Sequence, residues 1–133
     1  MTGPAVLRVQ AGQGGALPGG DALIPVPSGQ PVTLIEVIWN EPGPEGLTMR
    51  FRFLAPEIAE GTGSVGFDTA VIDMQALCDS YVLPRLAGIG SQASQVVVSL
   101  SDRRLPFGEA APEATQFFEA FRIEDGACIW EAF

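Results

Sequence analysis

Arginine supplies every positive charge of this chain, and three of the seven arginines are candidates for binding an anion together. Arg50 and Arg52 alternate within one predicted strand, so their side chains project from the same side, and Arg122 joins them from a later strand. A planar guanidinium pair is suited to holding a carboxylate or a phosphate through parallel hydrogen bonds. The alternative, which we favour, is a set of individually weak cross-strand ion pairs on a solvated face. The acidic candidates for those pairs are Glu36, Glu119 and Glu131.

Two residue types that enzymes use often are missing, because the chain contains no histidine and no lysine. Serine–histidine and cysteine–histidine catalytic units, imidazole metal sites and Schiff-base chemistry are therefore excluded. The two cysteines are too few for a four-cysteine zinc site. The acidic residues show no spacing typical of a metal loop or a glycosidase. We expect a protein that is not an enzyme and that has no cofactor and no metal.

The charge and length of the chain restrict its partners and its organisation. A formal net charge of −9 at pH 7 disfavours nucleic-acid binding. No stretch has the ~18 apolar residues of a membrane-spanning helix, so we expect no membrane insertion. A length of 133 residues suffices for one domain. We assign residues 1–31, which are rich in Gly and Pro, to a flexible N-terminal segment, and residues 32–133 to a single α+β domain.

Hydrophobic periodicity predicts five strands and one helix. Apolar residues recur every three or four positions between Phe67 and Val82, which indicates a helix. We expect it to end near Val82, because Pro84 disfavours helix in the residue before it. The strands are predicted at residues 32–39, 47–54, 95–101, 115–123 and 127–133. The predicted fold is α+β: a five-stranded, largely antiparallel sheet with one α-helix packed on one face, in ββαβββ order.

The dipeptide Asp125-Gly126 predicts a two-residue turn between the last two strands. This turn pairs Phe121 with Trp130 and places both side chains on the side of the sheet beneath the helix. The other side of the sheet stays open. Together with the loop at residues 102–114, it is the predicted surface for a protein partner. The residues assigned to that surface are Phe118, Ile129, Phe133, Arg103 and Arg104.

The two cysteines are expected to meet in space. Cys78 lies on the apolar face of the predicted helix, and Cys128 lies on the side of the last hairpin that faces it. We predict a disulfide, which would stabilise the fold by about 4 kcal/mol in the chain-entropy model and imply an oxidising compartment. The alternative is two buried free thiols, because cysteine is among the most buried residue types.

Four segments resemble a family of small alphaproteobacterial proteins known only as a domain of unknown function. They are residues 25–33 (PVPSGQPVT), 50–58 (RFRFLAPEI), 98–108 (VSLSDRRLPFG) and 114–133 (ATQFFEAFRIEDGACIWEAF). The resemblance implies an export signal and a periplasmic protein, in agreement with a disulfide, and brings no catalytic residues. The first residues of this chain do not read as such a signal. A periplasmic location therefore requires a signal that has been removed and a Met1 that is not native; otherwise the protein is cytoplasmic.

These observations favour a non-catalytic binding or accessory protein of the cell envelope. It would use the open sheet face and the loop at residues 102–114 against a protein partner. A small-anion sensor or enzyme built on the three arginines is the alternative. A homo-oligomer with a purely structural role is the third possibility.

Overall fold

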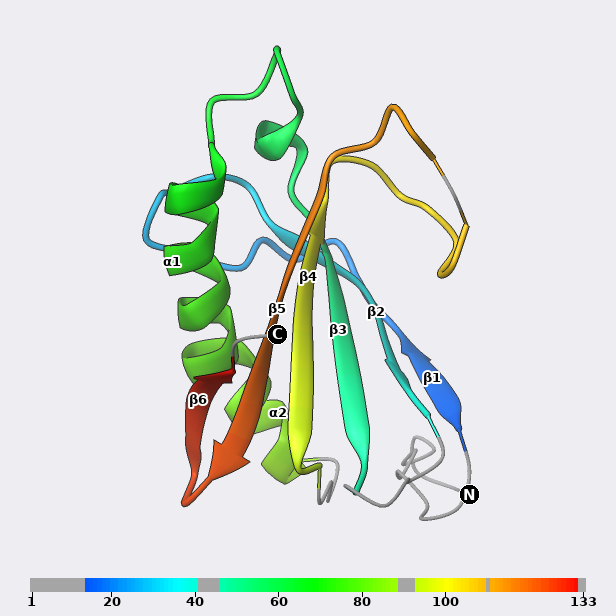
Figure 1. Ribbon diagram of the computed structural model, residues 1–133, viewed down its shortest axis with the longest axis vertical. Coiled ribbons are helices and arrows are strands. Elements are labelled where there is room, and N and C mark those ends of the chain that lie inside the picture. The colour runs from blue at the N-terminus through cyan, green and yellow to red at the C-terminus, as the bar shows by residue number, and fades with distance from the viewer. Residues whose placement is uncertain (1–13, 41–45, 89–92, 110, 132–133) are drawn as a thin grey trace.

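The computed structural model describes residues 14–40, 46–88, 93–109 and 111–131. Six strands form one sheet, and their order across the sheet is their order along the chain (Figure 1). Four of the five pairings are antiparallel, whereas β3 and β4 run parallel. The strands are β1 (Gly15–Pro18), β2 (Thr33–Trp39), β3 (Thr48–Leu54), β4 (Gln95–Ser101), β5 (Gln116–Glu124) and β6 (Ala127–Glu131).

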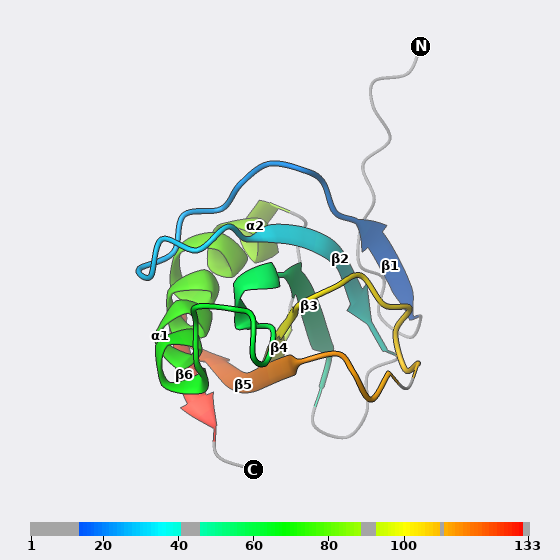
Figure 2. The same cartoon turned by 90° about the horizontal axis from the view of Figure 1, so that it is seen from above.

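The sixth strand corrects the prediction of five. It is β1, which lies inside the predicted flexible segment, residues 1–31, and pairs with β2. A short edge strand is held by backbone hydrogen bonds and tolerates Gly and Pro. Its composition therefore resembles that of a loop, and the sequence pattern did not predict it. Beyond β1 the chain runs out to the helix side and returns to β2 (Figure 2). Ile24 is buried there, and its N–H donates to the carbonyl of Val32 at 2.8 Å. Residues 14–31 thus belong to the folded domain.

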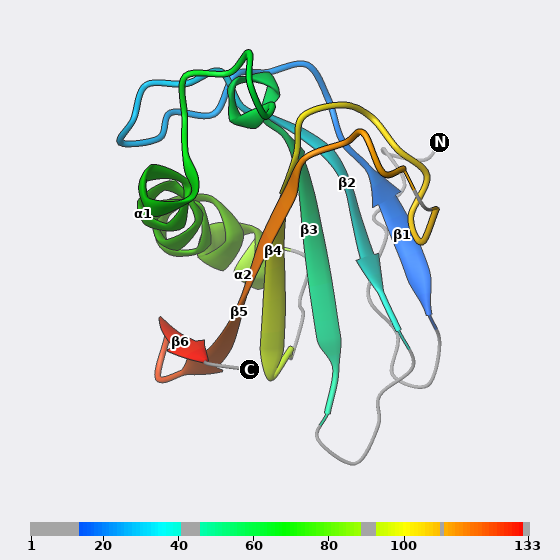
Figure 3. The ribbon, with the colours of Figure 1, turned by 45° about the horizontal axis from the view of Figure 1, so that its top comes forward.

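One continuous helical segment connects β3 to β4 and covers one face of the sheet (Figure 3). It comprises α1 (Phe67–Leu77), a π-helical turn (Cys78–Val82) and α2 (Leu83–Gly88), and a short 3-10 turn (Pro56–Ile58) precedes it. The helix therefore does not end near Val82 as predicted. In the π-helical turn the N–H of Leu83 donates to the carbonyl of Cys78, five residues back. Pro84, which has no N–H to donate, follows directly after this shifted hydrogen bond as the second residue of α2.

The core lies between the helical segment and the sheet, as the apolar periodicities require. Strand β3 contributes three side chains that are at most 1% exposed: Met49, Phe51 and Phe53. The apolar side chains of the helical segment that are fully buried are Ala70, Met74, Leu77, Cys78 and Val82. Phe67, which the helical pattern assigned to the same face, is 49% exposed because it begins α1. Its ring instead packs edge-on against Phe117, with 5.2 Å between the ring centres.

The last hairpin has the predicted register, with Phe121 opposite Trp130. Asp125 and Gly126 adopt φ angles of 53° and 73°, which is the left-handed conformation that the turn requires. Phe121 is buried, but Trp130 is 54% exposed, so the prediction that it lies beneath the helix is wrong. Strand β6 forms the edge of the sheet. The Trp130 indole N–H donates to the Glu119 carboxylate at 2.6 Å there, which satisfies its polar end.

The predicted disulfide between Cys78 and Cys128 is confirmed, with 6.2 Å between the two α-carbons. It joins the π-helical turn to β6. The side-chain amide of Gln75 donates to the backbone carbonyl of Cys128 at 3.2 Å, beside the disulfide. The helical segment is therefore attached to the far edge of the sheet by a covalent bond and a hydrogen bond.

A buried carboxylate on α1 holds the segment between β1 and β2. Asp73 is fully buried and accepts three hydrogen bonds. The backbone N–H and the hydroxyl of Ser28 donate at 3.0 and 2.5 Å, and the side-chain amide of Gln30 donates at 2.8 Å. A buried charge needs such partners to offset its lost hydration. This Asp73 anchor, formed by Asp73, Ser28 and Gln30, fixes the crossing segment against the helix.

Candidate anion-binding site

The face of the sheet away from α1, called the open face below, carries the predicted arginines. In the described part of the chain, every helix lies on the opposite side of the sheet (Figure 2). Alternation along β3 turns Arg50 and Arg52 to the open face, because Met49, Phe51 and Phe53 fill the core. The loop between β4 and β5 passes over the β1–β2 side of the sheet (Figure 3).

Arg52 is fully engaged with the protein. Its guanidinium forms an ion pair with Glu36, its cross-strand neighbour on β2. It also donates to the backbone carbonyl of Leu105 at 2.6 Å, which fastens the loop to the sheet. With only 6% of Arg52 exposed, this side chain is a structural connection between β2, β3 and the loop. The ion-pair alternative to anion binding holds for this arginine.

Arg50 differs from Arg52 in its partners. Its guanidinium carbon lies 5.2 Å from the centre of the Phe107 ring, which also stands 5.7 Å from the guanidinium carbon of Arg52. Among the described residues, no carboxylate forms an ion pair with Arg50. Burial, and secondarily the positive charge of Arg52, lower the pKa of Arg50 from its ordinary value. Arg50 is thus a half-buried cation that has no acidic partner in the described part of the chain.

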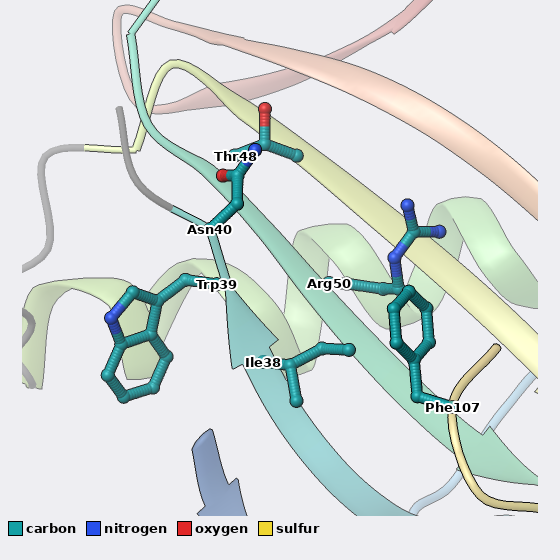
Figure 4. A pocket seen from close by; sticks show the side chains of 6 residues that line it. All are labelled: Ile38, Trp39, Asn40, Thr48, Arg50 and Phe107. Carbon is teal, nitrogen blue, oxygen red and sulfur yellow. The ribbon is translucent and has the colours of Figure 1, made fainter. Parts of the chain in front are cut away.

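Arg50 lines a cavity of about 240 Å³, called the Arg50 pocket below (Figure 4). Its lining is Ile38, Trp39, Asn40, Thr48, Arg50 and Phe107. Strand pairing explains this group, because Ile38 is the direct cross-strand neighbour of Arg50, and Thr48 precedes Arg50 by two residues on the same side of β3. Figure 4 shows the side chains of Asn40 and Thr48 next to one another and the Trp39 indole turned away from Arg50.

The polar groups of the Arg50 pocket are mostly donors. The Thr48 hydroxyl donates to the side-chain oxygen of Gln95 at 3.2 Å, so it is already used. The guanidinium of Arg50 and the amide of Asn40 supply further side-chain N–H groups, and the Trp39 indole N–H belongs to a ring that is turned away from Arg50. Ile38 and Phe107 add apolar walls. This arrangement is suited to a small anionic group attached to an apolar body.

Arg122 does not join the other two arginines. Strand β4 lies between β3 and β5, and Arg122 pairs with Gln95, which in turn pairs with Thr48 rather than Arg50. The Arg122 guanidinium donates to Glu124 at 2.7 Å and lies 3.8 Å from a Glu131 oxygen. The hydrogen bond to Glu124 raises the pKa of Arg122. Arg122 is therefore an exposed, ion-paired side chain, and Arg50 is the arginine that remains for a ligand.

The residues predicted to form a partner surface are dispersed. Phe118 and Ile129 both lie on the open face and are 57% and 38% exposed. Ile129 pairs with Arg122, four residues along β5 from Phe118, so the two side chains are separated by a row of the sheet. Arg103 is held by Asp102 at 3.1 Å, and Arg104 is exposed in the loop. Phe133 lies outside the described residues.

Sequence reasoning missed five residues of the Arg50 pocket: Ile38, Trp39, Asn40, Thr48 and Phe107. The hairpin of β2 and β3 offered a signal for the first four, since fixing its register would have set Ile38 opposite Arg50. Phe107 offered a weaker one, because it is the one aromatic residue in the sequence of residues 102–114. Its contact with two arginines depends on the path of the loop, which no local pattern encodes.

The fold and the pocket define a small α+β protein with an arginine-containing cavity on a sheet face that none of the described helices covers. Residues 5–133 match the sequence model of a family described as a family of unknown function, DUF6497, and the chain belongs to that family. No curated protein and no solved structure matches the chain. None of the helices in the described ranges is long and apolar enough to span a membrane. Within the same ranges, no three acidic, cysteine or histidine side chains gather as metal ligands do.

Proposed function

We propose that this chain is a non-catalytic binding protein that holds the anionic group of its ligand in the Arg50 pocket. One observation carries the proposal. The Arg50 guanidinium is half-buried, lines a cavity of about 240 Å³ and has no acidic partner among the described residues. A buried charge without a counter-ion is costly, so an anion that completes it is bound favourably. The lack of histidine and lysine supports binding rather than catalysis.

The first experiment compares two variants that each lose one positive charge. Arg50→Gln should weaken binding of an anionic ligand roughly 10- to 100-fold, the loss typical of a hydrogen bond to a charged group. Arg122→Gln is the matched control, because Arg122 is on the same face but is exposed and bound to Glu124. It should leave affinity unchanged. A thermal-shift screen of carboxylates and phosphates at millimolar concentration finds the ligand, and calorimetric titration measures the affinity.

Two results would contradict the proposal. One is that no carboxylate or phosphate raises the melting temperature of the natural protein. The other is that Arg122→Gln weakens binding as much as Arg50→Gln does, which would indicate attraction by overall charge. Circular dichroism of both variants checks that the fold is retained.

We place the protein in the cell envelope of an alphaproteobacterium, as an exported protein. The Cys78–Cys128 disulfide supports this location, because such bonds persist in oxidising compartments. The resemblance to small exported proteins supports it as well. Titration of free thiols in protein taken from its native cell, with and without reductant, tests the location. Two free thiols before reduction would contradict it.

A protein partner on the open face is the second candidate function. It is favoured by the exposure of Phe118, at 57%, on a sheet face that no described helix covers. Phe118→Asp should then abolish co-purification of the partner from the native cell while the fold is retained. Ile72→Asp is the control, because Ile72 is 60% exposed on α1, on the other side of the molecule. Equal loss in both variants, or loss in neither, would count against this surface. Light scattering over a concentration series tests whether the partner is a second copy.

A further inference from the structure

We infer that the Arg50 pocket selects a monocarboxylate joined to an apolar body, and that Phe107 recognises that body. This inference rests on the proposed function and adds to it the chemical class of the ligand. It is carried by the charge of the pocket, by the geometry of its donors and by its apolar walls.

The charge of the pocket matches one negative charge. Among the described residues, Arg50 is the cation that lines it. The neighbouring Arg52 is paired with Glu36, which offsets part of the attraction that Arg52 would exert on a second negative charge. The chain as a whole carries a net charge of −9, which opposes the approach of a dianion. A singly charged carboxylate is therefore favoured over a phosphate dianion.

The donors of the pocket match a planar acceptor. A guanidinium offers two parallel N–H groups in a plane, and a carboxylate offers two coplanar oxygens that accept them. Thr48 already donates its hydroxyl to Gln95, so it is not available to a third oxygen. Asn40 supplies further side-chain N–H groups, while the Trp39 indole of the lining is turned away from Arg50. A tetrahedral anion can accept from the same pair of guanidinium N–H groups, but it has more acceptor oxygens to satisfy than a carboxylate.

The walls of the pocket match an apolar body. Ile38 lies opposite Arg50 on the neighbouring strand, and the Phe107 ring stands over the guanidinium. Phe107 is 59% exposed, so an apolar body lying against its ring would remove hydrocarbon surface from water. A volume of about 240 Å³ is below that of most drug-sized sites and fits a single ring or a short branched chain.

Such a group reaches the pocket from one of two sources. It is either a free small acid or the C-terminal carboxylate of a peptide that ends in an apolar residue. The chemistry recognised is the same, a carboxylate beside an apolar side chain. The experiment therefore includes a probe for each source.

The experiment measures affinities by calorimetric titration for phenylacetate, acetate, inorganic phosphate and a tetrapeptide ending in phenylalanine, with a free or an amidated C-terminus. Phenylacetate should bind roughly tenfold or more tightly than acetate or phosphate, because of the surface that its ring buries. Phe107→Ala should remove this preference, and Phe107→Leu should keep part of it. Phe118→Ala is the control, since Phe118 is similarly exposed on the same face, and it should keep the preference in full.

Each outcome has a distinct meaning. Binding of phenylacetate but of neither peptide supports the inference with a free acid as ligand. Tighter binding of the free-acid peptide than of its amide supports it with a chain terminus as ligand. Equal affinities for phenylacetate, acetate and phosphate, or a preference that survives in Phe107→Ala, would overturn the inference and leave the proposed function standing. If no anion binds at all, the proposed function fails and the inference fails with it.

Discussion

Replacing Cys128 with alanine should lower the free energy of unfolding by about 4 kcal/mol. The disulfide joins residues that are 50 positions apart. In the chain-entropy model, its loss therefore raises the conformational entropy of the unfolded chain considerably. Cys78 is fully buried and Cys128 is 8% exposed, so alanine also leaves a small packing defect between the π-helical turn and β6. Urea unfolding at equilibrium, followed by circular dichroism, measures the change.

Chemical reduction provides the matched control for this prediction. The natural protein in the presence of a strong reductant should lose nearly the same stability as the variant in its absence, because both lack the same bond. The variant itself should be insensitive to reductant. A loss below about 1 kcal/mol in both cases would mean that the unfolded chain gains little freedom when the bond is broken.

Asp73→Ala should lower the free energy of unfolding by about 3 kcal/mol, the second large effect that we expect. The variant removes a fully buried acceptor and leaves the side-chain amide of Gln30 and the hydroxyl of Ser28 without their acceptor. Gln30 is only 6% exposed, so its amide bears the full cost of its lost hydration, whereas Ser28 is exposed and its donors bear less of that cost. The crossing segment between β1 and β2 should also loosen, with faster amide hydrogen exchange around Ser28.

Asp79→Ala is the control for the Asp73 anchor. Asp79 is exposed on the π-helical turn, and its donor among the described residues is the side-chain amide of Gln75, at 3.2 Å. Its loss should change stability by no more than about 0.5 kcal/mol. Similar decreases in the free energy of unfolding for both variants would contradict this prediction. They would show that the loss of an aspartate from this helical segment causes the effect, rather than the loss of the hydrogen bonds to Asp73. Unchanged exchange around Ser28 in Asp73→Ala would contradict the proposed role of the anchor.

Local patterns in the sequence predicted much of the sheet. Alternation of apolar and polar residues located β3, and Asp125-Gly126 set the pairing of β5 with β6 correctly. Both signals act between residues close in the chain, where turn geometry and side-chain direction leave few alternatives. The disulfide followed from two further patterns. The helical period placed Cys78 on the apolar face of the helix, and the register of the last hairpin placed Cys128 on the side that faces it.

Features that depend on tertiary contacts were not predictable in the same way. Strand β1 is stabilised by pairing with β2, although its own composition resembles a loop. The helix passes Pro84 because a π-helical turn shifts the hydrogen-bond pattern just before it. Trp130 is exposed because β6 lies at the sheet edge, and the importance of Asp73 appears only when the crossing segment reaches α1.

In the candidate site, too, local patterns predicted some features, whereas others depend on tertiary contacts. The common direction of Arg50 and Arg52 followed from strand geometry. The difference between their partners did not follow from it, because Glu36 and the carbonyl of Leu105 bind Arg52 and not Arg50. The separation of Arg122 follows from the insertion of β4 between β3 and β5, which the order of elements left open.

The agreement between strand order and chain order has a consequence for how the molecule folds. Strands β1 to β3 and strands β4 to β6 each form a meander that assembles by closing only local connections. The two meanders meet in the parallel ladder of β3 and β4, which forms only after the helical connection has brought the chain back to the same end of the sheet. The cost of closing a loop rises with its length, and non-local pairing slows folding. We therefore expect the union of these two halves to limit the speed of folding.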